Sequence, residues 1–200
     1  MESVKTVGAA LVAGSIFCIL ISLLRKKETF FNLREVVECH LSLFKECKFQ
    51  YVVFYGFPLL FAVGLAMLYE AGTAFYSELS VIMGILLGML FAILSIMAGH
   101  DFSGVEDAQQ RSNVKQVVNE TINAIIFDSM LCLFLMLYGL IIIVLEGVTI
   151  GALPVDVTLV KAILSGVAYY LFVVILLTLL LIVKHMSKII NFNLTVRKKS

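Results

Sequence analysis

The chain has 200 residues, of which 61% are hydrophobic and 14% are charged. Soluble proteins contain roughly 45–50% apolar and about 25% charged residues, so this composition excludes an ordinary soluble domain. The formal net charge of +1 indicates no particular partner, because 15 basic and 14 acidic residues cancel while lying very unevenly along the chain.

Five apolar blocks are each close to the 20 or so residues that a helix needs to cross a hydrocarbon core of about 30 Å. The first block could be a cleaved signal peptide, but Arg25-Lys26-Lys27 follows it in place of a small-residue cleavage site. We therefore expect it to be retained. No segment between the blocks is long enough to bury a core of its own, so the sequence predicts one all-α polytopic membrane domain over residues 1–200. The expected spans are residues 7–24, 51–69, 81–99, 122–145 and 159–183.

The lysine and arginine residues predict how these spans are oriented. With five crossings, Lys5 and Lys161 fall on one side, and the other 13 of the 15 basic residues fall on the opposite side. Basic loops stay in the cytosol, so segments 25–50, 100–121 and 184–200 are expected to be cytosolic and the N-terminus outside. The predicted location is the inner (plasma) membrane.

The first cytosolic segment contains an amphipathic pattern that leads into the second span. Its apolar residues recur at helical spacing and form one stripe, with charged residues on the other side. We expect a helix that either lies on the membrane surface or continues nearly coaxially into the span. The stripe consists of Leu33, Val36, Val37, His40, Leu41, Phe44 and Cys47.

The segment before the fourth span repeats this design. Val114, Val117, Val118, Ile122 and Ile125 keep helical spacing, and only Gly139 interrupts the helical pattern as far as Leu145. A single rod over residues 109–145 would be roughly 55 Å long and would project about two to four turns into the cytosol. The two halves share one plan, which suggests a duplication in parallel orientation.

Small residues recur every four positions at the third span. They allow two helix backbones to approach closely, which suits packing in lipid. The sequence leaves open whether they pack within one chain or between copies of an oligomer. The residues are Ser80, Gly84, Gly88 and Ala92.

Asp128 is the one acidic residue inside an expected span. At the centre of a lone helix it would cost roughly 3 kcal/mol, and such residues are candidates for function. Because Asp128 lies only two turns into its block, one interpretation is an interfacial carboxylate that water reaches from the cytosol. The other is a role in partner binding, ion sensing or oligomer contact.

The sequence carries no pattern that indicates catalysis. It contains no Ser–His–Asp set, no H-E-x-x-H, no phosphate loop and no pair of intramembrane carboxylates, so we expect a protein that is not an enzyme. Cys39 and Cys47 lie roughly 12 Å apart on one helix, too far to share a metal ion. No metal or cofactor is expected.

The two helix-plus-hairpin halves, residues 32–99 and 109–183, together with the near absence of outer domains, resemble the membrane subunit (KwaA) of the Kiwa anti-phage defence system. The resemblance implies a bacterial inner-membrane homo-oligomer that senses membrane disturbance caused by phage. It also implies a cytosolic, DNA-associated partner for that oligomer.

The residues themselves favour a homo-oligomeric membrane sensor or scaffold that docks a cytosolic protein. The alternative is a small channel or membrane-permeabilising effector formed by oligomerisation. Expected partners are further copies of the chain, a cytosolic protein and membrane lipids, without direct binding to nucleic acid. The expected docking residues are Arg34, Glu35, Glu38, Arg111, Lys115 and Glu120.

Overall fold

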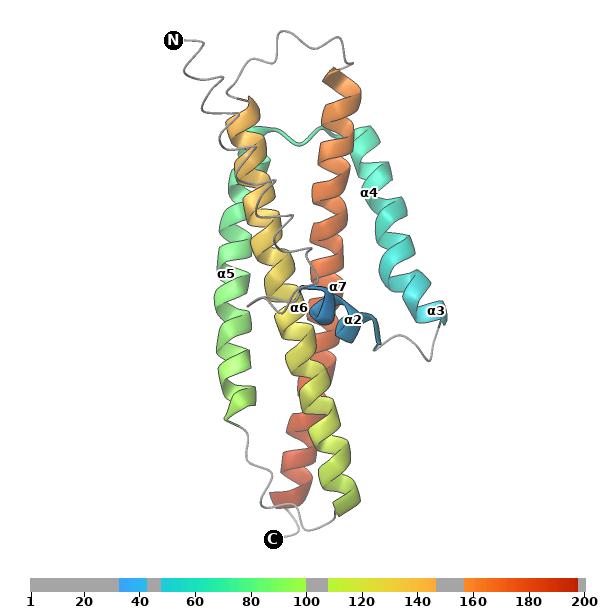
Figure 1. Cartoon of the computed structure of the whole chain (residues 1–200), viewed down its shortest axis with the longest axis vertical. Helices are drawn as coiled ribbons and strands as arrows, with labels where there is room; N and C mark the ends of the chain where they lie inside the picture. The colour runs from blue at the N-terminus through green and yellow to red at the C-terminus, as the bar shows by residue number, and fades with distance from the viewer. Residues whose placement is uncertain (1–32, 43–47, 100–107, 147–156, 198–200) are drawn as a thin grey trace.

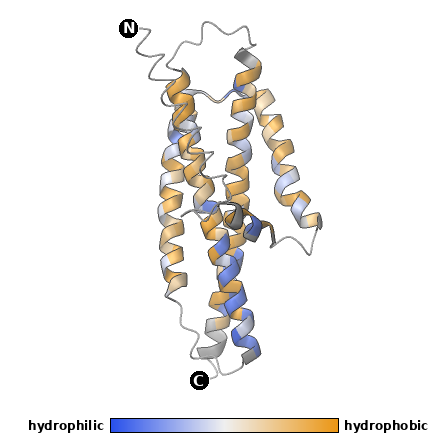
Figure 2. Ribbon diagram, in the orientation of Figure 1, coloured by the Kyte–Doolittle hydropathy of each residue, from blue (hydrophilic) through white to orange (hydrophobic). Residues whose placement is uncertain are grey.

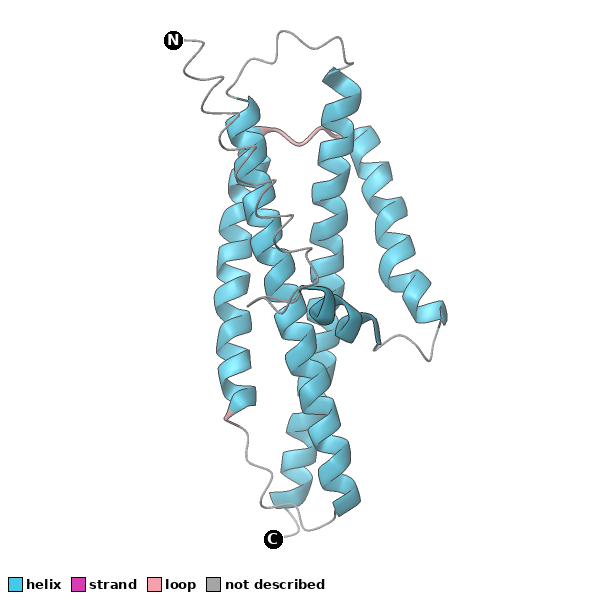
Figure 3. Ribbon diagram, viewed as in Figure 1, coloured by secondary structure: helices cyan, strands magenta, loops and turns pink. Residues whose placement is uncertain are grey.

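A computed structural model describes residues 33–42, 48–99, 108–146 and 157–197 of the chain (Figure 1). Apart from residues 69–72 and Gly99, all of these residues are helical (Figure 3), which confirms the all-α prediction. The helices are α2 (Leu33–Ser42), α3 (Lys48–Tyr51), the π-helix η1 (Val52–Gly56), α4 (Phe57–Leu68), α5 (Thr73–Ala98), α6 (Ala108–Glu146) and α7 (Val157–Arg197).

Three of these helices contain segments long and apolar enough to cross a membrane: Thr73–Ala98, Gln109–Leu145 and Leu159–Phe192. A fourth apolar segment, Val52–Leu68, is shorter. The expected span over residues 7–24 lies outside the described residues. The structure therefore supports a membrane protein but does not establish five spans.

The four long helices form an open row rather than a closed bundle. In Figure 1, α5 packs against α6, α6 against α7, and α7 against α4. Although α4 and α5 are consecutive in the chain, they occupy the two edges of this row. The short helix α2 crosses the row and packs against α6. The helix is not in line with α4, so the expected coaxial arrangement is wrong; it lies beside Phe127, near the start of the expected span 122–145.

Close helix contacts in the row depend on small residues. A Cβ atom at Gly139 of α6 would lie 3.4 Å from the Oγ of Ser80 and 3.5 Å from the carbonyl oxygen of Tyr76 on α5. A Cβ atom at Gly166 of α7 would lie 3.4 Å from the Cβ of Ala66 on α4. Small side chains at these points let apolar helices pack tightly without help from the hydrophobic effect.

The π-helix before α4 is explained by Pro58. Proline has no backbone N–H, and its ring clashes with the carbonyl group four residues earlier, which disrupts an α-helix. Here the N–H of Phe57 donates to the carbonyl oxygen of Val52, five residues back. The wider turn accommodates Pro58 and keeps the helical path continuous from Lys48 to Leu68.

The helix bounds can be compared with three of the segments expected from the sequence. The single rod expected over residues 109–145 is confirmed, since α6 runs unbroken from Ala108 to Glu146. Helix α5 starts at Thr73, before the expected span 81–99, and buries Tyr76 and Leu79. Helix α7 continues past the expected span end at residue 183 as far as Arg197, and its apolar period persists through Ile189.

Candidate functional site

Helices α6 and α7 extend together beyond the end of α5, and we call residues 108–121 and 184–197 the stalk. The antiparallel contact of Ser80 with Gly139 places the end of α5 near residue 121 of α6. The first 14 or so residues of α6 therefore project about 20 Å further. Val114, Val118 and Ile189 are buried in the stalk, so its two helices share a continuous apolar seam.

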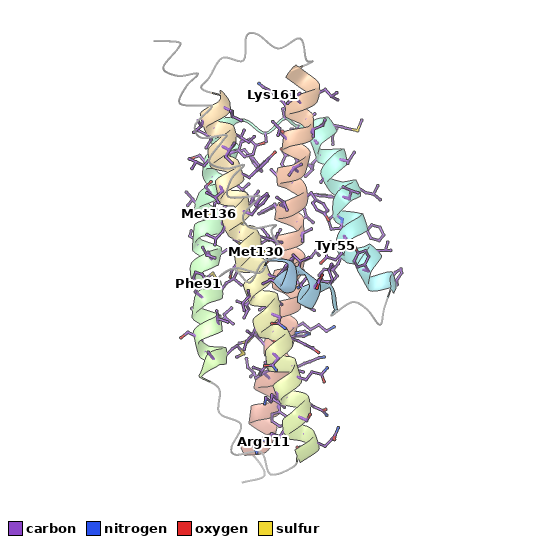
Figure 4. The ribbon with its side chains drawn as sticks, in the orientation of Figure 1. Tyr55, Phe91, Arg111, Met130, Met136 and Lys161 are labelled. Carbon is purple, nitrogen blue, oxygen red and sulfur yellow. The ribbon has the colours of Figure 1, made fainter. Side chains whose placement is uncertain are left out.

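The surface of the stalk is polar and basic. Figure 2 shows the lower part of α6 as the most hydrophilic stretch of the long helices, and Figure 4 places Arg111 at its end, opposite Lys161 at the other end of the row. Arg111 and Lys115 are exposed, as are Lys184 and Lys188 on α7. The stalk therefore presents a mostly positive face.

Among the expected docking residues, Glu120 is the half-buried acid of the stalk. The Nε2 of Gln116 donates a hydrogen bond of 2.9 Å to its Oε1, and the carboxylate is close enough to His185 to influence it electrostatically. Lys184 and Lys188 were missed by the sequence interpretation. Lys184 and Lys188 are four residues apart, as are the buried His185 and Ile189. This shared helical spacing is the signal that could have placed the two lysines on a helix rather than in a tail.

Helix α2 is attached to α6 by a ring stack. The rings of His40 and Phe127 lie parallel, with centroids 3.9 Å apart and an interplanar angle of 6°. His40 is fully buried, and this burial lowers its pKa from 6.5 to about 4. The imidazole is therefore neutral at physiological pH while α2 is docked.

The structure does not bring the two expected docking groups together. Glu38 of α2 is exposed, and the side chains of Arg34 and Glu35 lie outside what the structure describes. Along α6, Phe127 under α2 is twelve residues from Lys115, a separation of about 18 Å. A partner that contacts both α2 and the stalk would have to span that distance.

The small residues of α5 divide between two environments. Ser80 packs against Gly139, while a Cβ at Gly84 would come no closer than 4.0 Å to the Cε of Met136. A Cβ at Gly88 would meet no atom of the described residues within 4 Å, and Ala92 is exposed. Packing among the described helices therefore accounts for Ser80 but not for Gly88 and Ala92.

The small residues that pack helices in this structure were partly missed. Gly139 had been noted only as a possible helix breaker, and Ala66 with Gly166 had not been noted at all. The run Ala62-Val63-Gly64-Leu65-Ala66 is the signal that could have identified the α4 contact, since Ala62 and Ala66 lie on one helix face.

Asp128 lies in the interior of the row and is fully buried. It shares a face of α6 with Thr121, Ile125 and Cys132, which are also fully buried. Neither carboxylate oxygen has a hydrogen-bond partner among the described residues. The interpretation of Asp128 as an interfacial carboxylate in contact with water is therefore wrong for this structure.

At the far end of the row, hydrogen bonds join the loop 69–72 to α7 and α6 to α7. The backbone N–H of Ala71 donates to the Oγ of Ser165 at 2.9 Å, and the hydroxyl of Tyr138 donates to the carbonyl oxygen of Leu164 at 2.8 Å. Phe75 packs edge-on against Tyr169. These contacts tie α5, α6 and α7 together at the end opposite the stalk.

Within the described ranges, no three His, Cys, Asp or Glu side chains gather closely enough to hold a metal ion. Comparison of the chain with family models, with curated proteins and with solved structures gives no match. The stalk, helix α2 and the buried carboxyl of Asp128 are the features from which a function can be argued.

Proposed function

We propose that the chain is a non-enzymatic membrane scaffold or sensor that docks a cytosolic protein through its stalk. The observation that carries this proposal is the continuity of the stalk with two long apolar helices. Both α6 and α7 pass from apolar segments into the stalk without a break. A displacement of these helices in the membrane would therefore move the stalk as well.

The charge of the stalk supports its place in the cytosol. Arg111, Lys115, Lys184 and Lys188 are exposed on it, and basic segments of membrane proteins remain on the cytosolic side. An exposed basic face also attracts acidic surfaces and speeds encounter with them. We infer an orientation with the stalk in the cytosol and residues 69–72 at the outer surface.

The setting that the layout suggests is the bacterial inner membrane. The resemblance to the membrane subunit of the Kiwa system supports a role in anti-phage defence, with a DNA-associated partner docked on the stalk. A scaffold of this kind would assemble from several copies. The exposed Gly88 and Ala92 on α5 support such assembly, because they leave room for the helix of a second copy.

A channel formed by oligomerisation is the second candidate. It is supported by the buried polar side chains inside the row, Asp128 and Ser129 in particular. Intramembrane ionisable residues often mark ion pathways. Ion flux through liposomes that contain the purified protein, without any partner, is the measurement expected of a channel and not of a scaffold.

Site-specific photocrosslinking in the source cells tests docking. A photoreactive side chain at Lys115 or Lys188 should capture one soluble protein, and the same side chain at Lys161, at the other end of α7, should capture none. Charge reversal of Lys184 should weaken the capture from Lys188 while membrane levels stay unchanged. Absence of capture at both stalk positions, together with ion flux in liposomes, would reject the scaffold in favour of the channel.

The same chemistry at Gly88 tests assembly. A photoreactive side chain there should crosslink to a second copy of the chain, while one at exposed Leu60 of α4 serves as the matched lipid-facing control. Equal yields at both positions would contradict an interface on α5.

A further inference from the structure

Apart from Ser165 at the far end, the buried polar side chains described in the row lie between its centre and the stalk. Thr121, Asp128 and Ser129 on α6, and Thr178 and His185 on α7, are all buried. On the other side of Asp128, the same face of α6 continues with Cys132 and Leu135, which are apolar. A polar stretch therefore begins at the stalk and stops at Asp128.

The antiparallel pairing of α6 and α7 sets the heights of these groups. Tyr138 pairs with Leu164 at one end, and Glu120 lies near His185 at the other. Interpolation along these two helices places Thr178 beside Ile125, about one turn from Asp128. His185, Thr121, Thr178 and Asp128 thus follow one another upward from the stalk, within about 15 Å.

Several of these groups have no hydrogen-bond partner among the residues that the structure describes. The two carboxylate oxygens of Asp128, the Oγ of Ser129 and the Nδ1 of His185 are buried without a hydrogen-bond partner among the described residues. The hydroxyls of Thr121 and Thr178 donate to carbonyl oxygens of their own helices, at 2.7 and 3.0 Å. Their lone pairs can still accept a hydrogen bond.

An ionised carboxylate in this position would be very unfavourable. Transfer of an unpaired charge into an apolar interior is so costly that the group binds a proton instead. On α5, α6 and α7, the lysine and arginine side chains that the structure describes lie in the stalk or, for Lys161, at the far end of the row. Residues 81–98 of α5 contain no titratable side chain. On α6 the nearest titratable groups are Cys132 and Glu120, and on α7 they are His185 followed by Lys184 and Lys188. Helix α2 carries His40, which stacks on Phe127, and the exposed Glu38, while the side chains of Arg34, Glu35 and Cys39 lie outside what the structure describes.

We propose that Asp128 is a proton-binding site that is loaded from the stalk side of the membrane, along the polar side chains of the α6–α7 seam. A carboxylate oxygen takes up the proton, and the apolar residues beyond Asp128 close the route to the opposite side. Leu135 on α6 and Met83 and Leu86 on α5 are buried there. The proposal concerns a ligand of the membrane segment and stands whether or not a protein docks on the stalk.

Labelling with dicyclohexylcarbodiimide, an apolar reagent that modifies protonated carboxyl groups, tests the proposal. The full chain is reconstituted in liposomes with the pH set separately on each side, and the modified residue is identified by mass spectrometry. Labelling of Asp128 should fall about tenfold for each unit that pH on the stalk side rises beyond the midpoint of the site. It should not respond to pH on the other side. The exposed Glu78, near residues 69–72, reports the opposite side.

Two variants test the route to Asp128 while leaving Asp128 itself unchanged. His185→Gln and Thr121→Val should slow the response of labelling to a pH jump on the stalk side, while the labelling reached at equilibrium is unchanged. Ser165→Ala, at the other end of the seam, should leave the rate as in the wild type. A response to pH on the side of Glu78, no response on either side, or protection by sodium ions at constant pH would overturn the assignment of a proton site loaded from the stalk.

Discussion

The two halves of the chain have the same pattern in sequence but different structures. In the second half, the segment before the span and the span itself form one rod, α6, of 39 residues. In the first half, α2 is a separate helix that crosses α6, and the helical path that leads into α4 begins only at Lys48 and includes a π-helix. A shared hydrophobic pattern is therefore insufficient to define a shared fold.

The two segments differ because different helices pack against them. The face of α6 that begins at Val114 stays buried as far as Leu135, because α7 runs beside it and α5 covers much of it. Among the described helices, α2 packs against one side of α6, where His40 stacks on Phe127. Tertiary packing supplies most of the stability of a helix, so the partner decides whether a rod forms.

A charge in the stalk seam should have the largest effect. We expect Val118→Asp to destabilise the protein by about 3 kcal/mol, because a carboxylate would be buried without a partner. The thermal midpoint in detergent should fall, and proteolysis should begin in residues 108–121. Asn119→Asp is the control, because Asn119, the next residue along the helix, is exposed, and this variant should melt as the wild type does.

The corresponding change in the first half is Val37→Asp. It should destabilise the protein less than Val118→Asp does, since Val37 is only half-buried. Equal losses of stability would contradict the contrast between the halves.

The glycine contact between α5 and α6 should rank next. Gly139→Leu should cost about 1–3 kcal/mol, because the added side chain meets Ser80 and the backbone of Tyr76. Gly88→Leu should leave thermal stability unchanged, since no atom of the described helices lies within 4 Å of a Cβ there. If α5 packs against a second copy of the chain, native mass spectrometry of Gly88→Leu should show fewer copies per complex than the wild type. An unstable Gly88→Leu monomer would show that the open side of α5 is covered within the chain.

The docking of α2 should depend on pH through His40. Its pKa is about 4 when docked and 6.5 when free, so the neutral ring favours docking. Docking is fully favoured above pH 6.5 and weakens as pH falls from 6.5 toward 4. Hydrogen exchange of amides 33–42, corrected for intrinsic rates, should show less protection at pH 5 than at pH 7. His40→Phe keeps a ring on Phe127 without a titrating group and should remove this dependence, whereas an unchanged dependence would assign it to another residue.

The polar face of the stalk should contribute least. Gln116→Ala removes an exposed hydrogen bond to Glu120 and should cost about 0.2–0.5 kcal/mol. The shift in thermal midpoint should be close to the limit of detection. A shift as large as that of Val118→Asp would mean that the hydrogen bond, rather than the apolar seam, holds the stalk together.

Periodicity predicted the parts of the fold that depend on the chain's own local pattern. The all-α class and the rod over residues 109–145 follow from apolar residues at helical spacing, and both are confirmed. Helices α5 and α7 extend beyond the expected spans 81–99 and 159–183, because polar residues such as Ser77, Glu78 and Lys184 interrupt the hydropathy while the buried face continues. Hydropathy averages over all faces, whereas a helix ends only when its packed face ends.

The environment of individual residues could not be predicted in the same way. Asp128 was placed by its distance from the end of an apolar block, but its burial depends on α5 and α7, which pack from distant parts of the sequence. Likewise, the spacing of Gly84 and Gly88 indicates that a close contact is possible, and gives no information on whether another helix is present. The contacts of Gly139 with Ser80 and of Gly166 with Ala66 are similarly long-range.

The open row also sets the order in which the molecule can be assembled during synthesis. Helices α4 and α5 leave the ribosome first among the four long helices, yet they do not pack on each other. Helix α5 can pack only after α6 has been made, and α4 only after α7, whose residues 157–197 follow the other three helices in the chain. A nascent chain that stops after α6 would hold α4 without α7, so this edge of the row packs only after α7 has been synthesised.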